Sequence, residues 1–234
     1  LREMSVPVFS APGNHDPYDA RSPYAKLDIP QNVRIFTERD VECAELPELG
    51  VRVYGAAFTG STDGPDITNI RTERAEGTWN ILCAHGEVGF DPVNEQALSA
   101  SGLDYAALGH IHKASGLRRS GGTWYSWPGC PEGRGFDETG EKTVSIVELS
   151  DSGCRLTPVC IASRRYEILP VEVTGCDPLL AVHTVLPENT ARDVYRIVLT
   201  GEVDTPPDLS RLRRNLDDCF FSLQLRDETR LRQD

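Results

Sequence analysis

The first half of the chain alternates short apolar runs with glycine, proline and polar residues. One run alternates apolar and polar positions, as a half-exposed strand does, and the others are nearly continuous, as buried strands are. A further stretch between two of the runs indicates a short helix. This arrangement is typical of an α/β fold. The predicted strands cover Val6–Ser10, Val51–Ala56, Trp79–Ala84 and Leu103–Leu108, and the predicted helix covers Asn94–Ser101.

The middle of the chain predicts the strands that close this first domain. Apolar and aromatic residues fill Thr123–Trp127 and Lys142–Leu149, on either side of a loop rich in glycine and proline over Pro128–Gly140. A tight turn at Asp151–Gly153 then leads into a further strand over Cys154–Ile161. We expect these strands to belong to an antiparallel or mixed sheet.

From Arg165 onward the pattern predicts a β-α-β-α-β unit. A strand runs to about Val173, and Pro-Pro-Asp-Leu marks the start of a helix in which apolar residues recur at helical spacing over Leu209–Leu216. The other expected elements are a helix over Pro178–Leu186, strands over Val194–Leu199 and Phe220–Leu225, and the start of another helix over Arg226–Arg232. We therefore expect a first domain over residues 1–163 and a small α/β domain over residues 164–234.

Composition narrows the class of protein. The 234 residues are 39% hydrophobic, which is enough to bury one sizeable core and leaves room for a second small domain. No run approaches the roughly 18 apolar residues that span a bilayer, and the first residues do not resemble a signal peptide. We expect a cytoplasmic, globular protein. Seven cysteines without a Cys-x-x-Cys pair argue against zinc-ribbon and redox sites, and we expect them to be structural.

The charge of the chain is informative about nucleic-acid binding but does not decide it. A formal net charge of -12 argues against binding DNA or RNA by diffuse electrostatics. Bound divalent ions would neutralise some of the carboxylates, and local basic clusters such as Arg118–Arg119 and Arg164–Arg165 could still meet phosphates. The charge alone therefore leaves the substrate open.

Four of the five histidines lie in short turn-like segments that follow predicted strands. The segments are Gly13–Asp16 (Gly-Asn-His-Asp), His85–Gly86 and Gly109–His112 (Gly-His-Ile-His). Sites in α/β folds usually form on loops at the carboxyl ends of strands, so we expect these segments to converge. Their donors suit manganese, iron or zinc rather than a thiolate site. The fifth histidine, His183, is expected at the surface or its boundary.

Metal-assisted hydrolysis of a phosphodiester would use such a set. A pair of metal ions can supply the nucleophile and neutralise charge around phosphorus, and a free histidine can protonate the leaving oxygen. Gly13 permits a tight turn, Asn14 can offer a carbonyl oxygen to a metal, and His15 can point at the substrate instead. His110 and His112, two apart in an extended segment, would face the same side, and each could reach a metal.

These segments resemble the last three motifs of the calcineurin-like metallophosphoesterases. In addition, Tyr125–Arg134, followed by Gly140–Lys142, is similar to the Tyr-Pro-Gly-Ser-Pro-Glu segment and next strand of DNA-repair nucleases of the SbcD type, especially their YhaO-like branch. The resemblance implies a four-layer sandwich with a small α/β capping domain where Tyr166–Arg230 lies. Cys130 departs from the family, which has serine at this position.

The resemblance also implies roles for individual residues. Asn14, His85 and His110 would ligate one metal ion, and His112 would ligate the other. His15 would stabilise the transition state or protonate the leaving group. Two divalent ions, most often Mn²⁺ in that family, would support the cleavage of DNA by an activated hydroxide. An ATPase partner similar to SbcC is a further expectation, while no segment indicates which residues bind the substrate.

Two motifs of the family have no counterpart in this chain. Its Asp-x-His and Gly-Asp-x-x-Asp motifs belong upstream of Gly13, and only twelve residues precede that glycine. We therefore expect the first strands of the sandwich to be missing and the chain to be truncated, at its C-terminal end as well. His112 would then lack partner ligands from this chain, so we expect these 234 residues to be inactive or very weak alone.

Two alternatives remain open on the sequence. The first is a phosphoesterase of the same fold that acts on small substrates or phosphoproteins, which the acidic charge favours. The second is a degenerate, non-catalytic domain that only binds a partner. The segment Tyr125–Arg134 and the appended α/β domain favour DNA instead.

Overall fold

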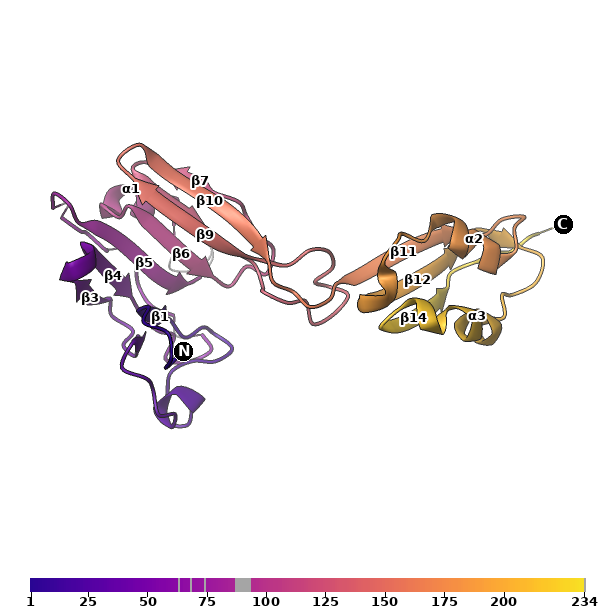
Figure 1. Cartoon of the computed structure of the whole chain (residues 1–234), viewed down its shortest axis with the longest axis horizontal. Helices are drawn as coiled ribbons and strands as arrows, with labels where there is room; N and C mark the ends of the chain where they lie inside the picture. Colours follow the sequence, from indigo (N-terminus) through magenta and orange to yellow (C-terminus); the bar gives the residue numbers. More distant parts are fainter. Residues whose placement is uncertain (63, 68, 74, 87–93, 234) are drawn as a thin grey trace. The chain divides into compact units, whose positions relative to one another are not determined.

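The computed structural model describes residues 1–62, 64–67, 69–73, 75–86 and 94–233. The chain divides into two compact units, which are described separately: Leu1–Cys130 with Val144–Val159, and Pro131–Thr143 with Cys160–Asp234 (Figure 1). The loop Pro131–Thr143 thus packs with the second unit, although it precedes the boundary expected after residue 163. That boundary between functional domains stays a prediction.

A six-stranded mixed sheet forms the centre of the first unit. Its four inner strands are parallel to one another, and an antiparallel strand lies at each edge. Parallel strands need cover on both faces, which agrees with the long apolar runs in their sequences. In spatial order the strands are β3 (Glu42–Leu46), β4 (Val51–Gly55), β5 (Trp79–His85), β6 (Tyr105–Gly109), β8 (Thr123–Ser126) and β7 (Arg118–Ser120).

One face of this sheet holds the main core of the first unit. Helix α1 (Glu95–Ser101) begins where the Asn94 side chain accepts a hydrogen bond from the Ala97 N–H at 2.6 Å. Leu98 of this helix packs with side chains of the central strands, and all of them are nearly inaccessible to solvent. The core consists of Ala56, Ile67, Ile70, Leu82, Ala84, Leu98, Leu103, Ala106, Leu108, Tyr125 and Trp127.

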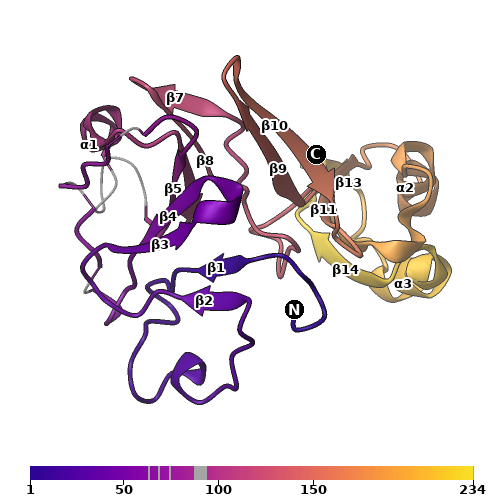
Figure 2. The ribbon, with the colours of Figure 1, turned by 60° about the vertical axis from the view of Figure 1, so that its left-hand side comes forward.

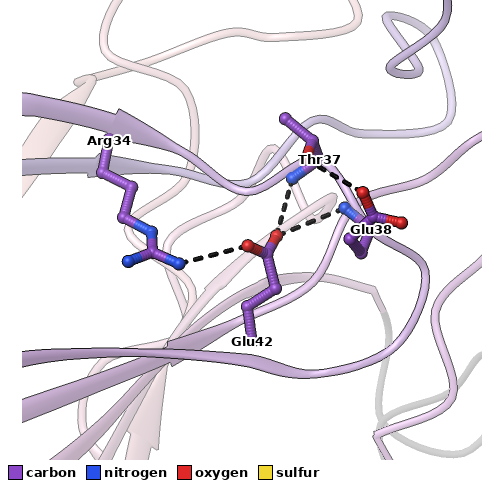
Figure 3. A network of polar contacts seen from close by, with 4 residues as sticks. All are labelled: Arg34, Thr37, Glu38 and Glu42. Carbon is purple, nitrogen blue, oxygen red and sulfur yellow. Dashed lines mark hydrogen bonds and ion pairs between the residues drawn. The ribbon is translucent and has the colours of Figure 1, made fainter.

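The N-terminal segment forms a small parallel sheet of its own, from β1 (Val8–Ser10) and β2 (Val33–Ile35). A polar network centred on Glu42 connects the end of β2 to β3 (Figure 3). The Glu42 carboxylate accepts hydrogen bonds from the Arg34 guanidinium at 3.1 Å and from the Thr37 backbone N–H at 2.8 Å. The network therefore anchors the N-terminal segment beside the central sheet. Short 3₁₀ turns cover Pro23–Ala25 and Pro47–Leu49.

A hairpin completes the first unit. Strands β9 (Thr143–Ser150) and β10 (Gly153–Cys160) pair with each other rather than with the central sheet. The tight turn between them is confirmed, as is a mixed sheet that includes β8. The structure thus keeps the hairpin and the central sheet as separate sheets.

The second unit is the expected β-α-β-α-β arrangement. Its three parallel strands lie in the order β11-β12-β14, and Figure 2 shows both helices on the same side of the sheet. Asp177 and Asp208 cap the two helices through their side chains. Apolar residues from the helices and from one sheet face form the core. The elements are β11 (Tyr166–Glu172), α2 (Pro178–Val185), β12 (Val194–Thr200), α3 (Leu209–Leu216) and β14 (Ser222–Asp227).

The prediction that a helix starts over Arg226–Arg232 is wrong. Strand β14 continues to Asp227, and a two-residue strand, β15 (Arg230–Leu231), pairs in parallel with β13 (Glu202–Val203). The Asp227 carboxylate accepts a hydrogen bond from the Thr229 N–H at 3.0 Å, which favours a turn there. Tertiary pairing therefore outweighs the local helical preference. The remaining short helices of the unit are 3₁₀ turns over Thr190–Arg192 and Asp217–Cys219.

The mixed α/β class is confirmed, because the described residues form a central mixed sheet with few helices. The four-layer arrangement stays a prediction. Within the described ranges, none of the helices has the length and apolar character needed to cross a bilayer.

Candidate metal centre

The first predicted ligand lies in a closed turn just after β1. The Asp16 carboxylate accepts a hydrogen bond from the Gly13 N–H at 2.9 Å and another from the Tyr24 hydroxyl. Burial, together with the hydrogen bond and negative charge of Asp16, raises the pKa of Tyr24 to about 12. Asp16 thus stabilises the turn from which Asn14 and His15 project. The Gly-Asn-His-Asp segment therefore combines a structural carboxylate with candidate chemical groups.

Three of the predicted ligands meet at the ends of β1, β5 and β6. The Oδ1 atom of Asn14 lies 2.9 Å from Nε2 of His85, and this Nε2 lies 3.3 Å from Nδ1 of His110. The two imidazole rings are nearly perpendicular, at 81°, with centroids 5.1 Å apart. The predicted convergence of these three side chains is therefore what the structure shows.

The three facing atoms can exchange a proton or share a cation, depending on the tautomers of the two imidazoles. A neutral imidazole carries either a hydrogen or a lone pair on Nε2. With a hydrogen, Nε2 of His85 can donate to Asn14 but cannot accept from His110; with a lone pair, it can accept from His110 and faces the side-chain amide of Asn14. A divalent ion would accept lone pairs from all three atoms at once. Donors about 2.0–2.2 Å from one metal ion lie about 3 Å from one another, as these do.

The glycines of two motifs are needed because the ring of His85 lies against both. A Cβ atom on Gly13 would lie 2.6 Å from Cε1 of His85, and one on Gly109 would lie 2.9 Å from its Nδ1. The ring of Phe58 meets His85 edge-on, with centroids 5.6 Å apart. The imidazole is thus held between two backbones and an aromatic side chain. Sequence reasoning did not include Phe58, and no motif marks it.

The segment that carries His110 and His112 differs from the expected one. Strand β6 ends at Gly109, and His110 has φ 96°, in the left-handed region that residues with a side chain rarely adopt. The expectation that the two histidines share one side of an extended strand is therefore wrong. His112 lies in the bent loop that follows, exposed, and its carbonyl accepts a hydrogen bond from the Cys130 N–H at 3.2 Å. Unusual backbone conformations of this kind are concentrated at functional sites.

The donor set shown by the structure is small. Within the described part of the chain, no group of three or more His, Cys, Asp or Glu side chains is placed to hold a metal ion. The convergent set comprises two histidines and the amide of Asn14. His15 is exposed, and its role, like that of His112 toward a second ion, stays a prediction. His183 is exposed on α2 in the second unit, as expected of a surface histidine.

The residues of the candidate centre lie within a segment that matches a known family. Residues 1–114, which contain all four histidine positions and Asn14, match the model of the family described as calcineurin-like phosphoesterase. The chain is also 28% identical over 243 residues to a protein of Bacillus subtilis (strain 168) named "Uncharacterized metallophosphoesterase YhaO". The match covers 96% of this chain and 58% of that relative. Residues 1–114 are therefore similar to the calcineurin-like phosphoesterases over just under half of the chain.

Proposed function

We propose that this protein is a metal-dependent phosphodiester hydrolase of the DNA-repair exonuclease type. The observation that carries the proposal is the meeting of Asn14, His85 and His110 at the carboxyl ends of three strands. The matched family supports metal-dependent hydrolysis of phosphoesters. Because the chain spans 58% of the length of the relative, the activity of the whole protein is part of the proposal.

The residues have separate roles in this proposal. Asn14, His85 and His110 hold one divalent ion, and His112 contributes to a second. When bound, two such ions, proposed to be Mn²⁺, would supply a nucleophile and the positive charge that phosphoester hydrolysis needs. His15 lies next to Asn14 in the same turn and is exposed, so it can meet the leaving oxygen and protonate it.

DNA is the proposed substrate because of the similarity over Tyr125–Arg134 and the α/β unit that follows the hairpin. An ATPase partner similar to SbcC and a cytoplasmic location complete the proposal. The formal net charge of -12 favours a second candidate, a phosphodiesterase or phosphatase for small substrates. The two candidates share the metal centre and differ only in what it cleaves.

Metal binding and hydrolysis test the proposal in two steps. Calorimetric titration with Mn²⁺ should show binding that Asn14→Ala, His85→Ala and His110→Ala each weaken, whereas His183→Ala serves as a matched control. The absence of binding, or binding that none of the three changes affects, would contradict the proposed centre. Cleavage of a DNA duplex or of bis-p-nitrophenyl phosphate that is lost in His15→Ala would support His15 as the proton donor.

A further inference from the structure

Trp127 lies directly after β8, where its side chain is buried beside the candidate metal centre. The side chain is only 4% exposed, and its ring meets Tyr125 edge-on with centroids 5.6 Å apart. The guanidinium of Arg118 lies 5.8 Å from the centre of the indole. The ring is therefore fixed on several sides, which makes its single N–H a well-oriented donor.

This N–H holds the residue that follows His85. The indole Nε1–H donates to the Gly86 carbonyl at 2.9 Å, in a buried hydrogen bond. The Gly86 N–H donates in turn to the Gly109 carbonyl at 3.3 Å. Both polar groups of the Gly86 backbone are thus engaged, one by Trp127 and one by the residue before His110. The backbone directly after His85 is therefore fixed by two hydrogen bonds.

The backbone of Trp127 also holds the loop that carries His110 and His112. Its N–H donates to the Ser115 hydroxyl at 3.0 Å, and its carbonyl accepts from the Ser115 N–H at 3.0 Å. Three residues later, the Cys130 N–H donates to the His112 carbonyl at 3.2 Å. Trp127 therefore connects Gly86, directly after β5, with the loop after β6.

We propose that Trp127 is a positioning residue that sets the orientation of His85 relative to His110. The expected effect of Trp127 on metal affinity rests on the proposed function. Tryptophan is the apolar residue that can fill this core position and still donate a hydrogen bond to the Gly86 carbonyl. Phenylalanine would keep most of the packing and leave that buried carbonyl without its donor. Groups that orient a ligand in this way influence metal affinity strongly.

The test compares Trp127→Phe with Trp124→Phe, a change three residues earlier, on β8, at a partly exposed tryptophan. Trp127→Phe should weaken Mn²⁺ binding about tenfold and alter the visible absorption of bound Co²⁺, which reports ligand geometry. Trp124→Phe should stay within about twofold of the unchanged protein. Thermal unfolding without metal measures the packing loss separately. Unchanged Mn²⁺ affinity and Co²⁺ absorption in Trp127→Phe would overturn the inference, even if its melting temperature falls.

A second measurement needs no metal and separates this inference from the proposed function. In the metal-free protein, the NMR signals of the His85 ring should shift in Trp127→Phe and not in Trp124→Phe. If the unchanged protein binds no Mn²⁺, the proposed function fails while the ring signals still decide the role of Trp127. If Trp127→Phe does not fold, Ser115→Ala replaces it, and a His85 ring that does not respond to the loss of the Ser115 hydroxyl would overturn the inference.

Discussion

The two units use parallel strands in the same way but end them differently. In the second unit, polar side chains at strand ends bond to their own neighbours: the Glu172 carboxylate accepts from the Thr174 N–H at 3.1 Å, and Asp227 serves Thr229 in the same way. In the first unit, the side chains of His85 and His110 turn toward each other across two strands. Parallel strands bring their carboxyl ends together in both units. A candidate metal centre forms only where donor side chains at those ends point toward one another across neighbouring strands.

Glycine shows the same contrast. Gly201, which follows β12 with φ 105°, allows the backbone to approach the Glu172 carboxylate. Gly13 and Gly109 allow the backbone to approach the ring of His85 instead. Both units use glycine for close approach at strand ends, but only in the first unit does the group that is approached belong to a candidate metal ligand.

The largest expected difference between the two units comes from removing one histidine from each. His85→Ala should lower Mn²⁺ affinity by at least about 100-fold, because it removes the donor next to both other ligands. His183→Ala removes an exposed histidine of the second unit and should leave the affinity unchanged. Isothermal titration calorimetry measures both. Equal losses in the two variants would show that the centre is not where the three side chains meet.

A core substitution in the second unit should affect stability and leave the metal centre intact. Leu216 on α3 is 0% exposed, so Leu216→Ala should reduce the free energy of unfolding by about 2–5 kcal/mol. Leu180→Ala, at an exposed position of α2, should cost less than about 0.5 kcal/mol. Urea denaturation gives both values. A parallel loss of Mn²⁺ affinity in folded Leu216→Ala would mean that the two units do not act separately.

A smaller effect should sharpen the role of glycine in the first unit. Gly13→Ala would place a methyl group within 2.6 Å of the His85 ring and should weaken Mn²⁺ binding about tenfold by displacing it. Gly122→Ala is the matched control, since a Cβ there meets nothing within 4 Å. If Gly13→Ala binds Mn²⁺ as tightly as the control, the ring does not depend on the close approach of this backbone.

The smallest expected effect concerns the carboxylate of Glu132 in the second unit, which accepts a hydrogen bond from a side chain of the same unit. The Ser163 hydroxyl donates to Glu132 at 2.6 Å, and this bond is the main cause that lowers the pKa of the Glu132 carboxyl below 4.5. The folded protein therefore favours the ionised form, so its stabilising contribution is present above about pH 4.5 and is lost as the pH falls through the lowered pKa. Ser163→Ala should raise this pKa toward its ordinary value in a ¹³C NMR titration. Ser152→Ala, in the hairpin turn, should not change it.

The pattern of apolar residues predicted most inner strands and both helices of the second unit, because burial on the two faces of a parallel sheet requires it. It missed the edge strands β3 and β7, whose sequences Glu-Cys-Ala-Glu-Leu and Arg-Arg-Ser are too polar to stand out. It also predicted a helix where β15 forms, since pairing with β13 depends on residues distant in the chain. Local pattern thus predicts elements best where burial is deep.

The candidate site also has one part that the sequence predicted and another that it could not predict. The residue types and their places after strands were sufficient to select Asn14, His85, His110, His112 and His15 as the groups to consider. Their mutual geometry was not accessible, because the contacts join side chains 71 and 25 residues apart in the chain. The packing of His85 between Gly13 and Gly109 also arises only when separate strands are brought together. The sequence thus determined which donors are available, and the tertiary structure decided which of them meet, because only folding places distant strand ends side by side.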